Sequence, residues 1–452
     1  MASVSSWVRP EGTFRLRQQD VPLALIVVYA VALLAIPSDI GLHLGALVLS
    51  PSRIVLCALV VLVVVDRSLR DALRSLPKPV LAAWLAFLIS AAATTLLNYS
   101  NQSLSRYGSL ALEGFALWAI VWCIARGRRG SDALQLTIVV ATTFVAGATL
   151  LLAAFNLSYG DVLGNMSLSA SSGSEVRFGL ARQAGSFPEP LFFATWLVGA
   201  SMLVLRWIED ERTPRRVLAW VAWAILFLAT VETVSRVGIV LMPAATAVYF
   251  LVRRRLALGA AMFTLALMAA LIVGGVVTPP SLPSFGPPAP SAPSATPTPV
   301  PSGSPVPSGP TEEVRLAGST TMRIESLQAA WPVLLEKPLF GWGLLNAAPV
   351  LSAQVGHPTF IDDTYVTWLV ELGLFGIAAF GLLVLAALRA ALRMPWSPVR
   401  LSRLLALAVL LGMVVFASFL SITQGYAGFV LLVALATVEV EAKPAEARFT
   451  SA

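Results

Sequence analysis

The sequence predicts an all-α, polytopic membrane protein with about twelve transmembrane helices. Of its 452 residues, 57% are hydrophobic and only 12% are charged, and the mean hydropathy is +0.80. A soluble domain of this length cannot bury so much apolar surface. Apolar runs of about 17 to 25 residues, long enough to cross a bilayer as helices, recur along the chain. Because lipid offers the backbone no hydrogen-bond partners, these runs are expected to be helical, and the alternating segments of a transmembrane β-barrel are not seen.

Hydropathy places the spans, in order, at 21–37, 50–66, 79–97, 105–125, 133–155, 187–208, 216–233, 236–252, 256–277, 362–386, 401–420 and 425–440. The first span follows a basic stretch and has no small-residue cleavage site behind it. It is therefore expected to be a retained helix and not a signal peptide. Cys57 and Cys123 both lie in apolar runs, which indicates small apolar side chains and neither a disulfide nor a metal site.

The distribution of Lys and Arg predicts the orientation. With the N-terminus inside and alternating spans, most of the 31 basic residues fall on the cytoplasmic side, as the positive-inside rule requires. Both termini are then cytoplasmic. The net charge of +7 follows from this asymmetry and is weak evidence for nucleic-acid binding. The basic residues left on the outer face are Arg53, Arg106, Arg177, Arg182, Arg236, Arg315, Arg323 and Lys337.

Five segments make up the predicted domain organisation. They are helices one to nine with short loops (1–277), a Pro/Ser-rich spacer (278–311), an outer-face helical loop (312–361), helices ten to twelve (362–440) and a cytoplasmic tail (441–452). The spacer is of low complexity and cannot bury a core, so it is expected to be extended and disordered.

The outer-face loop carries the pattern of an amphipathic helix. Ile324, Leu327, Trp331 and Leu334 recur at helical spacing, and Pro338 marks a stop. This helix is expected to lie on the outer membrane surface or to pack over a cavity.

Polar residues from stretches far apart in the sequence are expected to meet on the outer face. In chain order they are Arg182, Arg236, Arg323, His357, Asp362 and Asp363. Each alone has a structural explanation, because arginines snorkel to headgroups, aspartates cap helices and a lone histidine is usually a surface residue. Their coincidence on one face favours a functional site.

Acidic residues within the spans have two interpretations. Glu371 lies about eight residues, or ~12 Å, into the tenth span, a depth at which an acid is a functional candidate by default. It can also be structural, by pairing with Arg236 or by accepting hydrogen bonds from neighbouring helices. The same ambiguity applies to Glu113 and to Glu232.

This set of side chains suits glycosyl transfer from a lipid diphosphate donor. Guanidinium groups donate two hydrogen bonds at once to phosphate, so two arginines can clamp a pyrophosphate. A nearby aspartate or histidine can take the proton of an attacking hydroxyl. The diphosphate is already a good leaving group and the sequence has no metal-ligand cluster, so neither a metal nor another cofactor is expected.

At these residues the chain resembles the O-antigen ligase and O-antigen polymerase family of bacterial membrane glycosyltransferases. The resemblance covers roughly residues 180 to 380 and is carried, in order, by "RQAGSFPEP", "TVSRVGIV", "RIESLQAAWPVLLEKPLFGWGLLN" and "DDTYVTWLVELGLFG". It implies a GT-C-like fold with a large outer loop between spans nine and ten. It also implies a glycan donor on a polyprenyl diphosphate such as undecaprenyl diphosphate, and transfer on the outer face of the bacterial inner membrane.

The resemblance also implies roles for individual residues. Arg182 and Arg236 fall where the family's pyrophosphate-binding arginines fall. Ligases commonly have "HN" at the start of the span-ten motif, whereas this chain has two aspartates there and polymerase-like members often have "DN". Asp362 or His357 is then the base, although a helix N-terminus stabilises the charged form of Asp362 and makes it a weaker base. Residues assigned to glycan contact are Arg323, Trp342, Asp363 and Tyr365.

Three functions follow as hypotheses. The first is a polymerase that joins repeat units during cell-envelope polysaccharide biosynthesis. The second is a ligase that moves a finished glycan onto a lipid, protein or wall acceptor. The third is a flippase for lipid-linked oligosaccharide, against which stands the lack of a clear internal repeat. The expected partners are the lipid-linked donor, a glycan or lipid acceptor and the bilayer.

Overall fold

The computed structural model describes residues 20–38, 40–44, 47–126, 128–163, 176–177, 180–209, 213–273, 312–356, 363–415, 420 and 423–438. The predicted spacer at 278–311 and the predicted tail at 441–452 lie outside these ranges. Within them the fold is all-α, as predicted, apart from two short antiparallel hairpins.

The elements of the first half are α1 (Asp20–Ala35), β1 (Leu42–Leu44), β2 (Leu47–Leu49), α2 (Pro51–Val65), α3 (Arg67–Leu73), α4 (Lys78–Leu97), α5 (Asn101–Ser109), η2 (Leu110–Ala116), α6 (Leu117–Ala125), α7 (Arg128–Ala154) and α8 (Tyr159–Leu163). Those of the second half are β3 (Val176–Arg177), β4 (Leu180–Ala181), α10 (Pro190–Ile208), α11 (Thr213–Glu232), α12 (Arg236–Val252), α13 (Leu256–Val273), α14 (Glu312–Glu336), α15 (Ala347–Val355), α16 (Thr364–Arg393), α17 (Pro398–Met413) and α18 (Thr423–Thr437).

A helix lies at each of the predicted spans. Among the described residues, six helices are long and apolar enough to cross a membrane, and five more are apolar but shorter. The protein is therefore a multi-pass membrane protein. Two helix ends differ from the predicted spans by seven residues: α17 ends at Met413 and not at 420, and α16 continues to Arg393 beyond 386.

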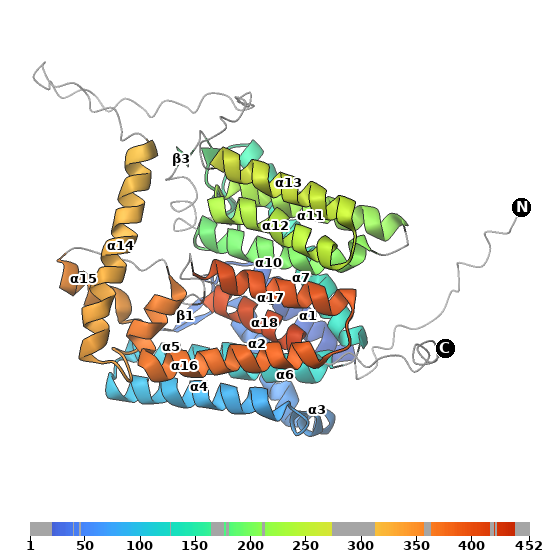
Figure 1. Cartoon of the computed structure of the whole chain (residues 1–452). Helices are drawn as coiled ribbons and strands as arrows, with labels where there is room; N and C mark the ends of the chain where they lie inside the picture. Colours follow the sequence, from blue (N-terminus) through green and yellow to red (C-terminus); the bar gives the residue numbers. More distant parts are fainter. Residues whose placement is uncertain are drawn as a thin grey trace, which may run out of the picture.

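The helices form one bundle with α10 at its centre (Figure 1). α10 packs against α7, α11, α12 and α17, and 83% of its apolar window is buried inside the protein. A helix that is apolar on every side is expected in such a place. α11, by contrast, is only 28% buried and presents Leu218 and Leu228 outward, as a lipid-facing helix does.

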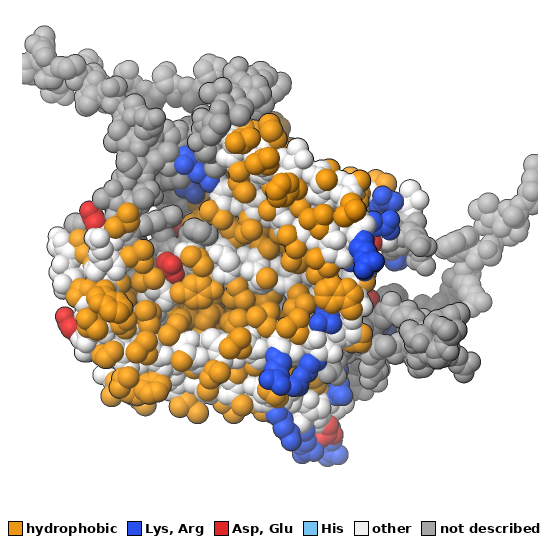
Figure 2. All heavy atoms as spheres, viewed as in Figure 1, with side chains coloured by type: hydrophobic (Ala, Val, Ile, Leu, Met, Phe, Trp, Pro, Cys, Tyr) orange, Lys and Arg blue, Asp and Glu red, His pale blue; other side chains and the backbone are white. Residues whose placement is uncertain are grey.

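Charge is distributed unevenly over the bundle. On the face shown in Figure 2, apolar side chains form a broad surface, and most of the visible Lys and Arg gather at one end, over α3 and the turn between α12 and α13. At the opposite end α14 crosses the bundle at a steep angle to the other helices (Figure 1).

α14 contacts the protein mainly through residues outside the predicted apolar stripe. Leu334 of the predicted apolar stripe is buried, but Ile324, Leu327 and Trp331 are all more than 45% exposed. The packed face carries the small residues Ser326 and Ala330 with Val333; the last two form a cluster with α15 and α16. The exposed stripe therefore points away from the bundle, which is the arrangement expected of a helix lying on a lipid surface.

α16 is interrupted on the side facing α14. Gly373 has φ 68° and ψ −169°, a conformation outside the helical region. The loop after α14 fills the break: Trp342 N donates to Val370 O at 2.9 Å, and Leu374 N donates to Pro338 O at 2.9 Å. Two further hydrogen bonds join the loop to the break: Gly343 N donates to Glu371 O, and Phe375 N donates to Leu339 O. Irregular backbone is tolerated within a membrane domain only where protein satisfies it, and this loop does so.

We expect Gly373→Ala to destabilise the protein by about 3 kcal/mol, because this backbone region is nearly closed to other residues. A Cβ there would also lie 2.5 Å from the carbonyl of Leu339. The measurement is the thermal unfolding midpoint of the purified protein in detergent. Gly381→Ala is the matched control, since it lies in the same helix with open space around it. Equal midpoints for the two variants would contradict the assigned role of the break.

Candidate functional site

Arg182 is hydrogen-bonded to the turn between α11 and α12, which is followed by Arg236. Its Nε donates to the carbonyl of Thr233 at 3.2 Å, and the next backbone N–H, that of Gln183, donates to the carbonyl of Glu232 at 3.1 Å. Two segments far apart in the sequence, the stretch before α10 and the turn between α11 and α12, are therefore held side by side. Both arginines of the predicted pair lie in this junction.

The turn itself is tightly specified. Val234 has a positive φ of 52° and is buried. Ser235 caps α12, with its Oγ accepting from Gly238 N at 3.3 Å, and Arg236 is the first residue of the helix. An arginine at this position stands beside the positive end of the helix dipole, so the junction favours an anion.

The stretch after Arg182 is buried against α1. Ser186 Oγ donates to the carbonyl of Leu34 at 2.5 Å. Gln183 is 4% exposed, and its side-chain oxygen has no hydrogen-bond partner among the described residues. A buried amide oxygen beside the two arginines is a candidate for substrate contact that the sequence analysis missed, although it follows Arg182 directly in the quoted motif.

At the start of α16, Asp363 acts as the helix cap. Its Oδ1 accepts from Tyr365 N at 2.8 Å and from Val366 N at 3.1 Å. Burial raises the pKa of this carboxyl, while the two backbone N–H groups act in the opposite direction. The hydroxyl of Tyr365 donates to the carbonyl of Leu411 at 2.9 Å. Both side chains, which were expected to contact the glycan, thus make hydrogen bonds within the protein.

The side chains of three predicted site residues are outside the described part of the structure. His357 and Asp362 lie outside the described residues, between the left-handed Gly356 that ends α15 and the cap of α16. Arg323 belongs to α14, but its side chain is not among those described.

Trp342 joins α14 to the loop that follows it. Its Nε1 donates to the carbonyl of Val333 at 2.8 Å, and the Nζ of Lys337 lies 4.1 Å from its ring centroid. The same Nζ donates to Asn98 Oδ1 at 2.7 Å. The ring that was expected to contact a sugar is therefore held between a cation and the last turn of α14.

Glu371 organises the loop inserted into α16. It is 4% exposed, and its carboxylate accepts from the backbone N–H groups of Leu345 and Ala347, the second of which opens α15. The sequence analysis offered either Arg236 or neighbouring hydrogen bonds as its partner. The structure places Arg106 near this carboxylate and supplies the backbone bonds as well.

Arg106 belongs to a chain of buried charges that reaches the first half of the bundle. Its Nη2 donates to the carbonyl of Leu420 at 2.8 Å, and it interacts electrostatically with both Glu371 and Glu113. Glu113 in turn pairs with Arg53, whose Nε lies 2.7 Å from Oε1. Arg53 and Arg106 are two of the basic residues that stood out on the predicted outer face, and both serve inside the protein.

Glu113 lies in η2, a π-helical turn within the span of α5 and α6. Such turns are rare and are often found at functional sites. Here the turn brings Glu113 toward Arg53, whose other nitrogens donate to Val48 O at 2.7 Å and to Ser109 Oγ at 3.0 Å. Among the described residues, no group of three or more His, Cys, Asp or Glu side chains is arranged to hold a metal ion.

Comparison with known families bears on the second half of this arrangement. Residues 221–381 match the family model described as O-antigen ligase. The match supports the resemblance of this part of the chain to the O-antigen ligase and polymerase family. The O-antigen ligase region begins within α11 and ends within α16, so it contains Arg236, α14, the inserted loop and Glu371. Arg182 lies before the matched region and is tied to it by the two hydrogen bonds described above. No curated protein matches the chain.

We expect Glu371→Gln to lower the thermal unfolding midpoint, with a loss of about 2 kcal/mol, because a neutral amide is a weaker hydrogen-bond acceptor than a carboxylate and interacts less favourably with the nearby guanidinium of Arg106. Loss of the carboxylate also weakens two backbone bonds of the inserted loop. Thermal unfolding in detergent measures the effect. Glu325→Gln is the control, since Glu325 is exposed on α14. If both variants unfold at the wild-type temperature, Glu371 does not hold the loop.

Proposed function

We propose that the protein transfers glycan from a polyprenyl-diphosphate-linked donor to a hydroxyl acceptor on the outer face of the cell membrane. The observation that carries this proposal is the junction of Arg182 and Arg236. Its two hydrogen bonds, from Arg182 Nε to Thr233 and from Gln183 N to Glu232, set two guanidinium-bearing segments against each other at the start of α12. One of the two segments lies inside the O-antigen ligase region.

The two arginines act on the diphosphate in this proposal. Each planar guanidinium donates paired hydrogen bonds to phosphate oxygens, and together they offset the negative charge that grows as the diphosphate leaves. The N-terminus of α12 adds to the same field. The diphosphate is already a good leaving group, so the main task of the protein is to position it and to neutralise its charge.

The reaction forms one bond and breaks one. The acceptor hydroxyl oxygen attacks the anomeric carbon of the donor sugar and forms the new glycosidic bond. The bond from that carbon to the diphosphate oxygen breaks, and its electron pair leaves with the lipid diphosphate. The hydroxyl proton passes to a base, for which Asp362 and His357 are the candidates. In the sequence, Asp362 immediately precedes Asp363, the cap of α16.

Two considerations support the outer face as the site of transfer. Visible Lys and Arg gather at the far end of the bundle from α14, and the positive-inside rule assigns that end to the cytoplasm. Arg182 and Arg236 belong to the smaller set of basic residues on the predicted outer side.

Polymerisation of repeat units is our preferred form of this function. The support is the pair of aspartates at the start of the span-ten motif, where ligases resembling this chain commonly have a histidine. The family description, O-antigen ligase, supports the second form, in which a finished glycan is moved once onto another acceptor.

A transporter function would draw its support from the interrupted α16 and the buried charges. Transporters use broken helices whose freed backbone groups bind substrate or ions. Here four of the backbone groups at the break are already bonded to the loop at 338–343. We therefore favour glycan transfer over transport as the function of the protein.

Charge-conserving substitutions test the arginine pair. We expect Arg182→Lys and Arg236→Lys each to reduce kcat/KM about 10- to 100-fold, because a lysine keeps the charge but loses the paired donors. The assay incubates purified protein with a polyprenyl-diphosphate-linked repeat unit and separates the products on a gel. Arg255→Lys, exposed at the far end of α12, is the control. Wild-type rates in both site variants would refute the clamp.

The same gel distinguishes the base and the reaction type. We expect Asp362→Asn or His357→Ala, whichever removes the base, to slow transfer about 10²- to 10⁴-fold, the usual contribution of a general base. A ladder of products from wild type indicates polymerisation, and a single shifted band that requires an added acceptor indicates ligation. Donor that is bound but never converted, with any acceptor, contradicts both and favours transport.

A further inference from the structure

A pocket of about 600 Å³ opens between α7, α10 and α11, away from the arginine junction. It lies beside the last turns of α10, where Arg206 and Trp207 are found, and the first turns of α11, where Arg215 is found. Glu232, which accepts a bond in the arginine junction, is the last residue of α11. At a rise of 1.5 Å per residue, Arg215 at the charged end of the pocket lies about 25 Å along α11 from Glu232, close to the thickness of a bilayer core.

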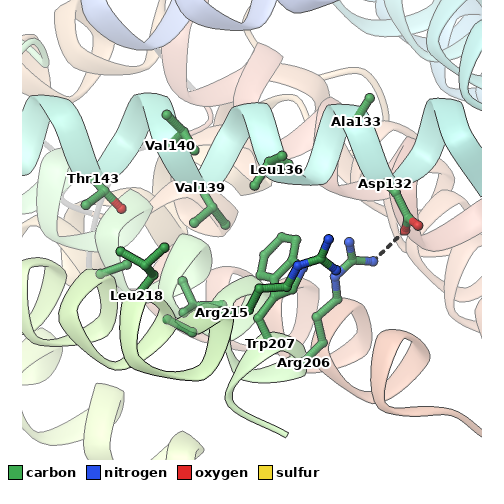
Figure 3. Close-up of a pocket in the computed structure, with 13 residues that line it drawn as sticks. Asp132, Ala133, Leu136, Val139, Val140, Thr143, Arg206, Trp207, Arg215 and Leu218 are labelled. Carbon is green, nitrogen blue, oxygen red and sulfur yellow. Dashed lines mark hydrogen bonds and ion pairs between the residues drawn. The ribbon is translucent and has the colours of Figure 1, made fainter. Parts of the chain in front are cut away.

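One part of the pocket is aliphatic and open to the surroundings. Leu136 and Val140 of α7 are 51% and 58% exposed, and Leu218 of α11 is 67% exposed. Figure 3 shows these side chains on facing helices, with the pocket between them. In a membrane protein such a surface is in contact with lipid tails, so the pocket is a groove that an acyl chain can enter from the side.

The other part is charged. Arg206 Nη1 lies 2.6 Å from Asp132 Oδ1, and its Cζ lies 4.1 Å from the ring centroid of Trp207. Figure 3 shows the guanidinium groups of Arg206 and Arg215 at the Asp132 end of the pocket. The buried guanidinium of Arg403 is also close enough to act on Arg206 and Asp132. Arg206 and Arg403 therefore both act on Asp132, and the guanidinium of Arg215 lies at the same end of the pocket.

We propose that this groove binds one anionic phospholipid. Its phosphate lies against Arg215 and Arg206, and one acyl chain runs along Leu136, Val140 and Leu218. Aliphatic walls that end in arginines and a tryptophan match the two parts of a phospholipid, and basic pockets between transmembrane helices on the cytoplasmic side suit anionic headgroups. The net positive charge of the polar end selects an anionic headgroup over a zwitterionic one.

The bound lipid has a structural consequence. α11 is the least buried of the helices long enough to span the membrane, and its far end carries the turn with Arg236. A lipid held between α7 and the first turns of α11 adds contacts to this least buried helix. The site is independent of the proposed glycan transfer, because none of its lining residues belongs to the arginine junction.

The test uses the full-length purified protein in detergent, titrated with dioleoyl phosphatidylglycerol, dioleoyl phosphatidylcholine or soluble glycerol phosphate. Native mass spectrometry counts bound lipid, and the thermal unfolding midpoint reports stabilisation, because a ligand that binds only the folded state raises it. We expect phosphatidylglycerol to bind about tenfold more tightly than phosphatidylcholine, a difference of the size that one or two arginines confer on an anionic lipid. Glycerol phosphate should have no effect.

Variants locate the site. Arg215→Glu should remove the tenfold preference, whereas Arg216→Glu should keep it, because Arg216 is equally exposed but does not line the pocket. Leu218→Trp should fill the aliphatic part and weaken phosphatidylglycerol binding. Both target residues are exposed, so folding is expected to be preserved. Equal binding of the two lipids, an undiminished preference in Arg215→Glu, or binding of glycerol phosphate as tight as that of the lipid would each overturn the proposal.

Discussion

The backbone of α16 needs hydrogen-bond partners at the point where Gly373 interrupts it, and this requirement organises one end of the bundle. A helix satisfies its own N–H and C=O groups, but a broken helix within a membrane domain does not. The loop that follows α14 supplies the missing partners, with Trp342 and Gly343 donating to Val370 and Glu371. α14 is thereby fixed to the membrane domain through its last turn, and α15 begins against the carboxylate of Glu371.

The same end of the bundle depends on charges that are not in water. Arg53, Glu113, Arg106 and Glu371 come from α2, η2, α5 and α16, so they connect the first half of the chain with the inserted loop. Buried ions of this kind are costly unless paired. Their arrangement therefore holds the relative position of these helices: moving any one of them would strand a charge.

Local patterns in the sequence were sufficient to predict the positions of the helices, but not the contacts between them. Apolar runs predicted where helices lie because the length and polarity of a span are local properties. The partner of Glu371 depends on which helices pack together, and sequence spacing alone could not choose between Arg236 and Arg106. For α14 the apolar stripe was read correctly as amphipathic, but the protein-facing side proved to be the one with small residues, since Ala330 allows close approach and Trp331 does not.

The candidate site could be proposed from the sequence where its residues stand out by charge or by position. Arg182 and Arg236 were singled out because basic side chains are unusual on that face, and the two aspartates because they stand at the start of a predicted span. Gln183 was not, because a buried amide has no signature in a hydropathy profile. Asp363 could be predicted as a cap from its position before the span, and the geometry agrees with that interpretation.

The junction between Arg182 and Arg236 is made through main-chain atoms on the α11–α12 side: the carbonyl groups of Glu232 and Thr233 accept both bonds. The side chains at positions 183 and 232 take no part in them. Substitutions at these two positions can therefore reshape the surroundings of the arginines without moving them. Under the proposed function, such substitutions would change the surroundings of the donor while the main-chain bonds that hold the two arginine-bearing segments together stay in place.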